Sequence, residues 1–411
     1  MAFASPPLRA HLLWAVQIIG NSAAGSIQAR RDGCIAVASA AREGDDARVS
    51  SSGEPSPAPL RLDRRHPVSR RIIASWRSLI AAQGGEPAGE PTLVACSGGA
   101  DSTALSLALA SAKAQLALAF ARHGARPSAD VDRDQRTVEQ LAEALGADFL
   151  AVDCVAEDGQ SPSEADMRRN RYASLANEAR RRSIRFVASA HHADDQMETV
   201  LMALLRGSGP QGMAGVPASR PLDDLTPPVM LLRPMLNITR LEVEDLCRDF
   251  GVHPPGDAGR EWAEDRTNSN RQYARNRIRH EVAPLLERMY PGFAQRVSRS
   301  ADLFRQMSTL LRTRVREFDD RCGSEESPQG RTWPRSELRA LEPIEIGELL
   351  RSVVESEFNR NGLDRLDSLM LMRVAEAAHD RSTEPRTFEF GDGLSARVLA
   401  NRVTLTRKSP A

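Results

Sequence analysis

The sequence lacks net charge, because Lys plus Arg and Asp plus Glu each number 55 among its 411 residues. Without an overall positive field the whole molecule is not drawn to nucleic acid or to an anionic membrane, so any site for a polyanion has to be local. Lysine itself is nearly missing, with Lys113 and Lys408 as exceptions. Arginine suits phosphate recognition, although genomic base composition, the explanation we favour, produces the same bias.

Cysteine is scarce and widely spread, and long apolar runs are missing. Positions 34, 96, 154, 247 and 322 contain no C-x-x-C pair, so a redox or zinc motif is excluded and reduced structural thiols are indicated. No stretch approaches the roughly 18 apolar residues that span a bilayer. We therefore expect a cytoplasmic protein with no membrane partner.

The first 66 residues are rich in Ala, Ser, Gly and Pro and hold no periodic apolar face. Segment 12–20 is apolar but short, and Arg30 and Arg31 follow it. A signal or transit peptide is one interpretation. A disordered extension or a start codon placed too early are the two that we favour, so we exclude these residues from the fold.

Short apolar runs alternate with helical patterns from residue 70 onward. We expect strands at 92–96, 115–121, 149–154 and 185–190, and helices at 136–145, 167–182 and 193–205. This alternation predicts an α/β fold in which helices cover both faces of a parallel sheet. A helical domain and a small α+β C-terminal unit should follow, since helical periodicity resumes at 238–250 and short strand patterns occupy 387–405.

The expected domains follow from these changes in pattern. They are an N-terminal extension at 1–66, a nucleotide-binding domain at 67–217, a proline-rich linker at 218–234, a helical domain at 235–325 and a C-terminal substrate-binding unit at 326–411.

A glycine-rich loop links the first expected strand to a helix. The strand at 92–96 runs directly into Ser97-Gly98-Gly99-Ala100-Asp101-Ser102. Two glycines let the backbone adopt positive φ and approach a ligand closely, and the free N–H groups and dipole of the helix start favour an anion. Asp101 would cap the helix or hold Mg²⁺ against phosphates. A plain capped strand-to-helix turn is the alternative, but six residues in this order favour a phosphate site.

The order Ser-Gly-Gly-x-Asp-Ser resembles the PP-loop of ATP-pyrophosphatases, and no Gly-Lys-Ser/Thr of a Walker loop follows. The resemblance implies cleavage of ATP between its α- and β-phosphates, adenylation of a carbonyl oxygen and displacement of AMP by a nucleophile. It assigns Ser97, Gly98, Gly99, Ala100, Asp101 and Ser102 to ATP binding, with Asp101 as the candidate Mg²⁺ ligand.

An acidic turn follows the fourth expected strand at the carboxyl end of the sheet, where ligands bind. His191 and His192 precede it, and Asp194, Asp195 and Glu198 fall within one helical turn. The alternative is an acidic helix start favoured by the dipole. Because like charges so close require a cation, we expect Mg²⁺ or a substrate ammonium group here. Adjacent histidines on a turn point apart, which disfavours zinc.

This stretch is similar to a signature region of tRNA(Ile)-lysidine synthetases. The similarity continues through Arg206-Gly207-Ser208-Gly209 and 212–215. A His-Gly-Leu-Arg element of the family is matched at 123–126, with Ala125 in place of leucine. Residues 264–284 resemble the family pattern Asp-Pro-Ser/Thr-Asn followed by Arg-Asn-Arg-Ile-Arg, with Arg266 in place of the proline. The matches cover about residues 90–290.

The arginines of this last segment predict a local RNA-binding surface. Solvated ion pairs to Glu281 and Glu287 are the alternative. The expected tRNA-binding residues are Arg206, Arg233, Arg275, Asn276, Arg277 and Arg279.

The family resemblance implies a substrate and a reaction. The wobble cytidine of a CAU-anticodon isoleucine tRNA is adenylated at O2 by ATP, and the ε-amine of free lysine then attacks C2. Asp101, Asp194, Asp195 and Glu198 become the candidate catalytic residues, the last three orienting lysine or a metal. A tRNA thiolase and a non-catalytic RNA-binding relative are the alternatives, and a homodimer is left open.

Overall fold

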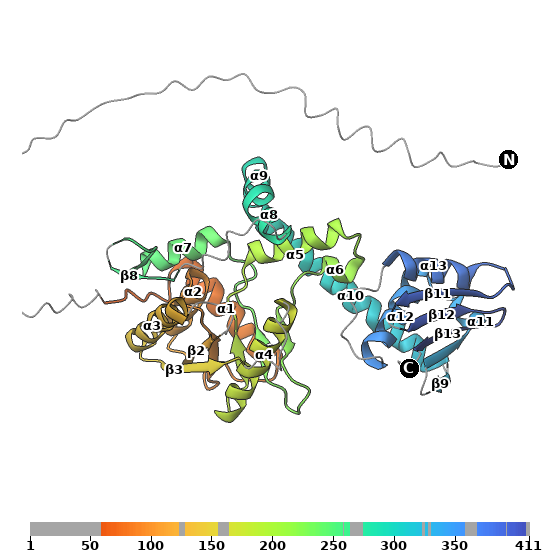
Figure 1. The fold of residues 1–411 in the computed structure, drawn as a ribbon, viewed down its shortest axis with the longest axis horizontal. Coiled ribbons are helices and arrows are strands. Elements are labelled where there is room, and N and C mark those ends of the chain that lie inside the picture. Colours follow the sequence, from red (N-terminus) through yellow and green to blue (C-terminus); the bar gives the residue numbers. More distant parts are fainter. Residues whose placement is uncertain are drawn as a thin grey trace, which may run out of the picture. The chain divides into compact units, whose positions relative to one another are not determined.

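The computed structural model describes residues 59–122, 128–154, 164–257, 259–263, 274–322, 325–327, 330–357, 368–391 and 393–407. The largest sheet of the described chain has six strands in the order β3-β2-β1-β4-β6-β5 (Figure 1). The strands are β1 Thr92–Ala95, β2 Leu116–Arg122, β3 Asp148–Asp153, β4 Phe186–Ala188, β5 Ser219–Pro221 and β6 Met230–Leu232. All neighbours are parallel except β5 and β6, which confirms the expected α/β class.

Helices cover both faces of this sheet, as the apolar runs predicted. In β1, Val94 faces one buried cluster and Leu93 faces another, because successive side chains of a strand point to opposite faces. Helices α1 Pro67–Ala82, α2 Ala100–Ser111 and α3 Ser128–Leu145 pack on the first face, and α4 Glu164–Arg181 packs on the second.

The sheet extends into the segment that we expected to be a linker, 218–234. Met230, Leu231 and Leu232 are all buried, and their strand pairs in parallel with β4. Pro221 is tolerated because β5 lies at the edge of the sheet, where a missing N–H costs no ladder bond. The prolines of this segment indicate a break in the chain, and they outweigh the short apolar run 229–232 between Pro228 and Arg233.

Helix α5 Ala193–Leu205 coincides with its expected bounds, and the short α6 Pro210–Met213 follows. Helix α7 Arg240–Asp249 packs on α2 in the first cluster. Strands β7 Val252–His253 and β8 Arg260–Glu261 form a separate pair. Beyond residue 273 come α8 Ala274–Arg277, a π-helical turn Ile278–Val282 and α9 Ala283–Met289.

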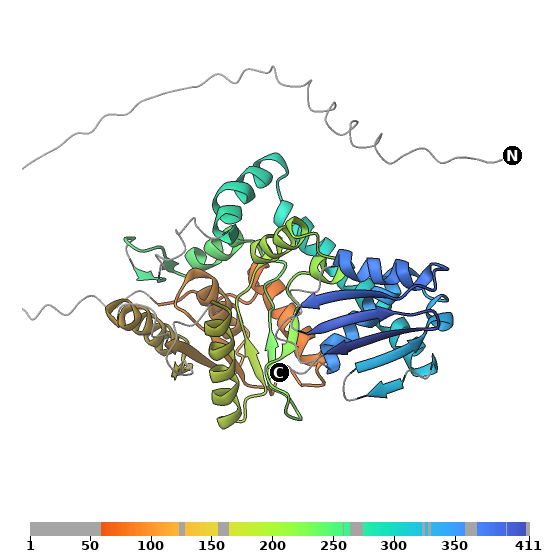
Figure 2. The same ribbon diagram turned by 45° about the vertical axis from the view of Figure 1, so that its right-hand side comes forward.

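A 30-residue helix, α10 Phe293–Cys322, contacts α5 at one end and the C-terminal helix α12 at the other (Figure 1). The C-terminal elements are α11 Arg335–Leu338, α12 Pro343–Glu357, α13 Ser368–His379 and the five strands β9 Glu325–Ser327, β10 Gly330–Pro334, β11 Arg386–Gly391, β12 Leu394–Val398 and β13 Arg402–Arg407. The strands form an antiparallel sheet beside these helices (Figure 2). Trp333 and Leu349 lie in their common core, which confirms the expected small α+β unit.

No helix among the described residues is both long enough and apolar enough to cross a membrane.

Candidate active site

The phosphate loop and the acidic turn meet at one point of the sheet. Strand β1 lies between β2 and β4, and the chain runs from β1 outward through β2 and β3 before it returns to β4 on the other side. The carboxyl ends of β1 and β4 therefore flank a topological switch point, where ligands of open α/β sheets bind. Residues 97–102 follow β1, and His191 and His192 follow β4.

Gly98 gives the loop its turn. Its φ of +83° lies in the left-handed region, and an added Cβ would meet the Asp134 carbonyl oxygen at 3.3 Å. Gly99 has φ −69° and is the N-cap of α2. Of the two glycines expected to need positive φ, only Gly98 has it.

Hydroxyl groups hold the rest of the loop. Ser102 Oγ accepts a hydrogen bond from the Ser97 backbone N–H at 3.2 Å and donates to the Gly99 carbonyl at 3.1 Å. The Cys247 thiol donates to the Ala100 carbonyl at 3.4 Å, and burial raises the pKa of this thiol. The loop is thus fixed before any ligand arrives, with the N–H groups at the start of α2 facing the switch point.

His192 connects the phosphate loop to the acidic turn. It is 3% exposed, and its ring nitrogens lie 3.6 Å from Asp101 Oδ1, 3.4 Å from Asp194 Oδ2 and 3.6 Å from Asp195 Oδ2. Burial alone would lower the pKa of His192, but the three carboxylates raise it well above its usual value. His192 is therefore an imidazolium that holds Asp101 beside α5.

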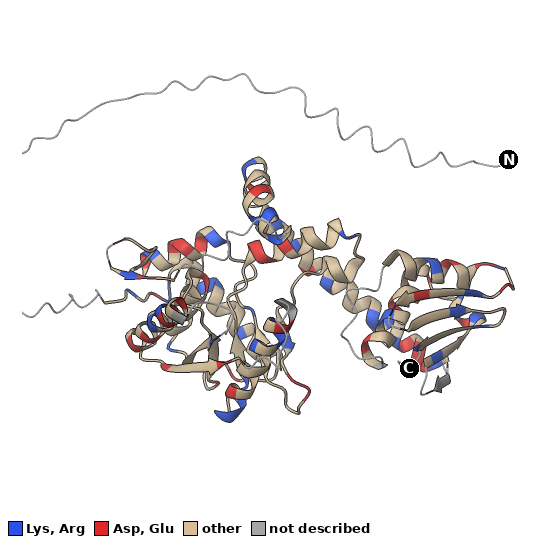
Figure 3. Ribbon diagram, in the orientation of Figure 1, with Lys and Arg blue, Asp and Glu red and all other residues tan. Residues whose placement is uncertain are grey.

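The acidic turn already has cations from its own chain. Glu198 is 1% exposed, and its two carboxylate oxygens accept hydrogen bonds from Arg275 Nε at 2.8 Å and Arg279 Nε at 2.6 Å. The same two guanidinium groups lie 3.3 and 3.2 Å from Asp195 Oδ1. We call these four residues the arginine clasp, which joins the start of α5 to α8 and the π-helical turn. Figure 3 shows basic and acidic positions on the ribbon close together where α8 approaches α5. The cations that we expected beside these carboxylates are thus supplied by two arginines of the chain itself.

Asp194 does not bind the two arginines that Asp195 and Glu198 bind, but caps a helix instead. Its Oδ2 accepts a hydrogen bond from the Arg240 backbone N–H at 2.9 Å, so it satisfies a free donor at the start of α7. Burial would raise the pKa of Asp194, but His192 and this backbone bond lower it.

The other residues expected to bind tRNA are placed unequally. Arg277 is exposed and lies 3.8 Å from Glu281, the solvated pair that we held as the alternative. Asn276 is half-buried. Arg233 is 2% exposed and donates from Nη1 to the Pro217 carbonyl at 2.7 Å, so its guanidinium group does not face solvent.

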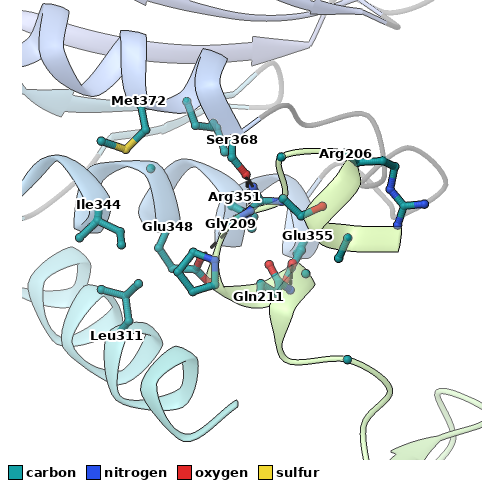
Figure 4. Close-up of a pocket in the computed structure, with 18 of the residues that line it drawn as sticks. Arg206, Gly209, Gln211, Leu311, Ile344, Glu348, Arg351, Glu355, Ser368 and Met372 are labelled. Carbon is teal, nitrogen blue, oxygen red and sulfur yellow. Dashed lines mark hydrogen bonds and ion pairs between the residues drawn. The ribbon is translucent and has the colours of Figure 1, made fainter. Parts of the chain in front are cut away.

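Arg206, the remaining residue of that set, is exposed at the rim of a cavity of about 710 Å³ (Figure 4). The cavity lies between the end of α5, α6 and the C-terminal helices. Leu311, Ile344 and Met372 line one side, and Gln211 and Glu355 lie on another. Arg312 pairs with Glu348 at 2.9 Å and Glu355 at 3.0 Å, and Arg351 lies 3.9 Å from Glu348, so two cations of the chain face these two carboxylates.

Residues 123–127 and 264–273, which include the His-Gly-Ala-Arg element and Arg266, lie outside the described residues. Among the described residues, no group of three or more His, Cys, Asp and Glu side chains is arranged to hold a metal ion.

Comparison with known proteins gives the family. A PP-loop domain family matches residues 75–286, which is more than half of the chain. A tRNA(Ile)-lysidine synthase of Bordetella bronchiseptica is 33% identical over 313 residues, covering 75% of this chain and 86% of that protein. The chain belongs to the tRNA(Ile)-lysidine synthase family.

Other members of the tRNA(Ile)-lysidine synthase family match a shorter part. Those of Alkalilimnicola ehrlichii and Rhodopirellula baltica are 38% and 31% identical and align with 63% and 60% of this chain. The chain spans 54% and 64% of their lengths. A solved U34-tRNA thiolase of Methanococcus maripaludis aligns with a TM-score of 0.44 at 15% identity, over 59% of this chain and 80% of its own.

Proposed function

We propose that this chain ligates lysine to C2 of the wobble cytidine in a CAU-anticodon isoleucine tRNA, with release of AMP and pyrophosphate. Family membership supports the reaction class. The observation that carries the proposal is the meeting of the 97–102 loop with the acidic turn at the switch point, joined through His192. A phosphate site and a carboxylate site side by side suit a reaction that joins an ATP-activated group to an amine.

The first step transfers AMP to the base. The cytidine O2 forms a bond to the α-phosphorus of ATP, and the bond to the bridging oxygen breaks, so that pyrophosphate leaves with the electron pair. Backbone N–H groups of the loop and the Ser97 hydroxyl would bind the phosphates, and Ser102 would keep the loop in shape through its hydrogen bond to the Gly99 carbonyl. Because these donors are fixed in advance, they stabilise the charge without reorganising.

Asp101 would hold Mg²⁺ in this step. Its side chain is 41% exposed, and Mg²⁺ is commonly bound by one or two carboxylates together with substrate phosphates, which fits a single loop carboxylate. The ion supplies countercharge to the phosphates when it is bound.

In the second step the lysine ε-ammonium loses a proton to solvent, the resulting amine attacks C2, the bond from C2 to O2 breaks, and AMP leaves with the electron pair. Asp195 and Glu198 would bind and orient the lysine before attack. Burial would raise the pKa of Asp195, but the charge of His192 and a hydrogen bond from the His192 backbone N–H lower it, so this carboxyl stays ionised and is suited to hold an ammonium group.

The arginine clasp occupies these carboxylates, so lysine can reach them only after Arg275 and Arg279 turn away. We infer that the two guanidinium groups move to phosphates of the bound tRNA or nucleotide. One exchange then accounts for both expected roles, RNA binding by the arginines and lysine binding by the carboxylates. Lysine would bind after tRNA and ATP.

The test combines the protein with ATP, labelled lysine and an unmodified CAU-anticodon isoleucine tRNA. Label should enter the wobble nucleotide, one AMP being formed for each lysine joined. The same tRNA with adenosine at the wobble position is the control and should stay unlabelled. Pyrophosphate release without label in the tRNA would contradict lysine as the nucleophile.

A further inference from the structure

Four arginines gather around one buried tyrosine on the second face of the sheet. The guanidinium carbons of Arg220, Arg171 and Arg168 lie 4.9, 5.4 and 5.7 Å from the ring centre of Tyr172. Burial would raise the pKa of Tyr172, but the charges of Arg168, Arg233 and Arg171 beside it lower that pKa. We call these five residues the Tyr172 cluster. Each guanidinium contact with a ring face is favourable, but the arginines repel one another.

Among the described residues, the cluster has no anion of its own. In the part of the chain that the structure describes, none of the four arginines lies within 4.0 Å of a carboxylate. Other arginines on or next to α4 do have partners, Arg169 with Asp166, Arg180 with Asp223, and Arg181 and Arg182 with Glu178. Among the described residues of α4, only the arginines that face Tyr172 are therefore unpaired.

Burial raises the free-energy cost of holding these positive charges together. Desolvation lowers the pKa of Arg220, and it lowers that of Arg233 to about 10. Arg233 is 2% exposed, and its Nε has no hydrogen-bond partner among the described residues. Desolvated cations without a counterion are costly, and a bound anion would offset that cost.

The cluster adjoins the active site. Arg168 Nη2 lies 3.5 Å from His191 Nε2, and His191 precedes the His192 that contacts Asp101. Desolvation lowers the pKa of His191 to about 3, so its ring is neutral and adds no charge to the cluster. Arg233 follows β6, which pairs with β4, so it lies at the same carboxyl edge as the switch point.

We propose that Arg168, Arg171 and Arg220 form a second oxyanion site that binds a phosphate group beside the reacting nucleotide. All three are half-buried, so they are accessible and held in place, and their planar forks match phosphate oxygens. Arg233 is buried beneath them and positions Tyr172. The phosphate is either a phosphodiester of the RNA or part of ATP and pyrophosphate, and only this choice of source rests on the proposed function.

The experiment uses the full chain with Arg168→Gln and Arg220→Gln combined. The control is Arg181→Gln, which removes an exposed arginine from the far end of the same helix. Binding is measured for a CAU-anticodon tRNA transcript, an unrelated tRNA transcript and inorganic pyrophosphate, each at several salt concentrations. The thermal unfolding midpoint is recorded without ligand.

We expect the double variant to bind both transcripts roughly tenfold more weakly, with a salt slope less negative by about 0.7 to 0.9 for each phosphate that is no longer neutralised. Both transcripts should respond because binding to phosphates carries no base information. The ligand-free midpoint should stay equal or rise, because removing crowded positive charges relieves repulsion. A structural role would lower it instead.

The three binding measurements distinguish the source of the phosphate and test whether the site exists. Weaker tRNA binding with unchanged pyrophosphate binding identifies the RNA backbone as the source, and the reverse pattern identifies the nucleotide. Unchanged binding of all three probes overturns the oxyanion site. Because no arm uses lysine, a chain that fails to transfer lysine could still show these effects, so the two proposals fail separately.

Discussion

At the scale of single residues, the two adjacent histidines have opposite electrostatic roles. His192 gains three carboxylates and keeps its proton, whereas His191 is desolvated among arginines and loses it. Ser189 Oγ lies 3.0 Å from His191 Nδ1, and Arg168 lies on its other side. The backbone turn after β4 separates the two rings and sends each into a different field.

This difference predicts a maximum of stability near pH 6.5. The folded-state pKa of His192 is raised, so its contribution is full below about 6.5, the pKa of an unfolded histidine, and is lost as pH rises toward the folded value. That of His191 is lowered to about 3, so its contribution is present above 6.5 and falls as pH drops. Each proton gives a slope of up to about 1.4 kcal/mol per pH unit.

Unfolding curves of wild type, His191→Gln and His192→Gln between pH 5 and 9 measure these slopes. His191→Gln should reduce the slope of the free energy of unfolding against pH below about pH 6.5. His192→Gln should reduce the slope above it. An alkaline slope that survives in His192→Gln would show that another group is responsible.

The sequence could predict Asp101, Asp194, Asp195 and Glu198 as one group, because motif spacing and strand ends place them together. It could not predict His192 as the link, since two consecutive histidines look alike until the backbone separates their rings. Nor could it pair Arg275 and Arg279 with Glu198, which lies 77 and 81 residues away. Such pairing depends on tertiary packing, which local pattern does not contain.

At the scale of elements, the arginine clasp joins α5 to α8 and the π-helical turn. Replacing Glu198 by Gln leaves two guanidinium groups without their closest carboxylate. We expect the free energy of unfolding to fall by about 3 kcal/mol, the lower end for breaking a buried ion pair, because the arginines are partly exposed. Calorimetry measures the loss.

Glu281→Gln is the matched control, since its pair with Arg277 lies on the same turn but is exposed and 3.8 Å long. Its effect should stay below about 1 kcal/mol. Equal effects of the two substitutions would show that the clasp contributes no more than a solvated pair.

The phosphate loop offers a second comparison between neighbours. Gly98→Ala should lower stability by about 1 to 2 kcal/mol, because alanine is disfavoured at φ +83°. Gly99→Ala should change stability by less than about 0.5 kcal/mol, since its φ is −69° and its nearest atoms would lie at 3.6 Å. Urea unfolding without ATP gives both values, and a larger loss in Gly99→Ala would refute this account of the turn.

The bounds of α5 and the parallel direction of the strands followed from apolar periodicity, which local sequence contains. Strands β5 and β6 did not, because three-residue strands are shorter than the patterns that reveal them. The length of α10 was also missed. Most of its buried face consists of small or polar residues, such as Ala294, Ser298, Ala301 and Ser308, which form no apolar stripe in the sequence.

At the scale of the whole molecule, two buried cores are separate. One surrounds the sheet and includes Trp76, Phe186 and Phe250, and the other surrounds Trp333 in the C-terminal unit. We expect two calorimetric transitions, only one of which responds to ATP. At a hundredfold excess over its Kd, ATP should stabilise that transition by about 2.7 kcal/mol. A single transition that shifts as a whole would contradict separate cores.

Arg335 identifies the other transition. Its buried guanidinium group donates to the carbonyls of Ala377, Ala378 and Asp380 near the end of α13. Arg335→Met should lower the ATP-insensitive transition by about 3 kcal/mol or more, because it leaves several buried acceptors without donors. Arg339→Met, which removes one exposed donor to Asp380, is the control and should cost under about 1 kcal/mol. A shift of the ATP-sensitive transition in Arg335→Met would oppose this assignment.

The balanced arginine clasp also affects how substrates arrive. The four charges of the clasp sum to zero, so on the proposed function the clasp itself does not steer free lysine toward the site from beyond about 8 Å at physiological salt. The unpaired arginines of the Tyr172 cluster project an attractive potential, and a polyanion is steered toward them at a rate that falls with ionic strength. On the proposed function, tRNA should therefore associate at a rate that falls with ionic strength, whereas the rate for lysine should change little with salt.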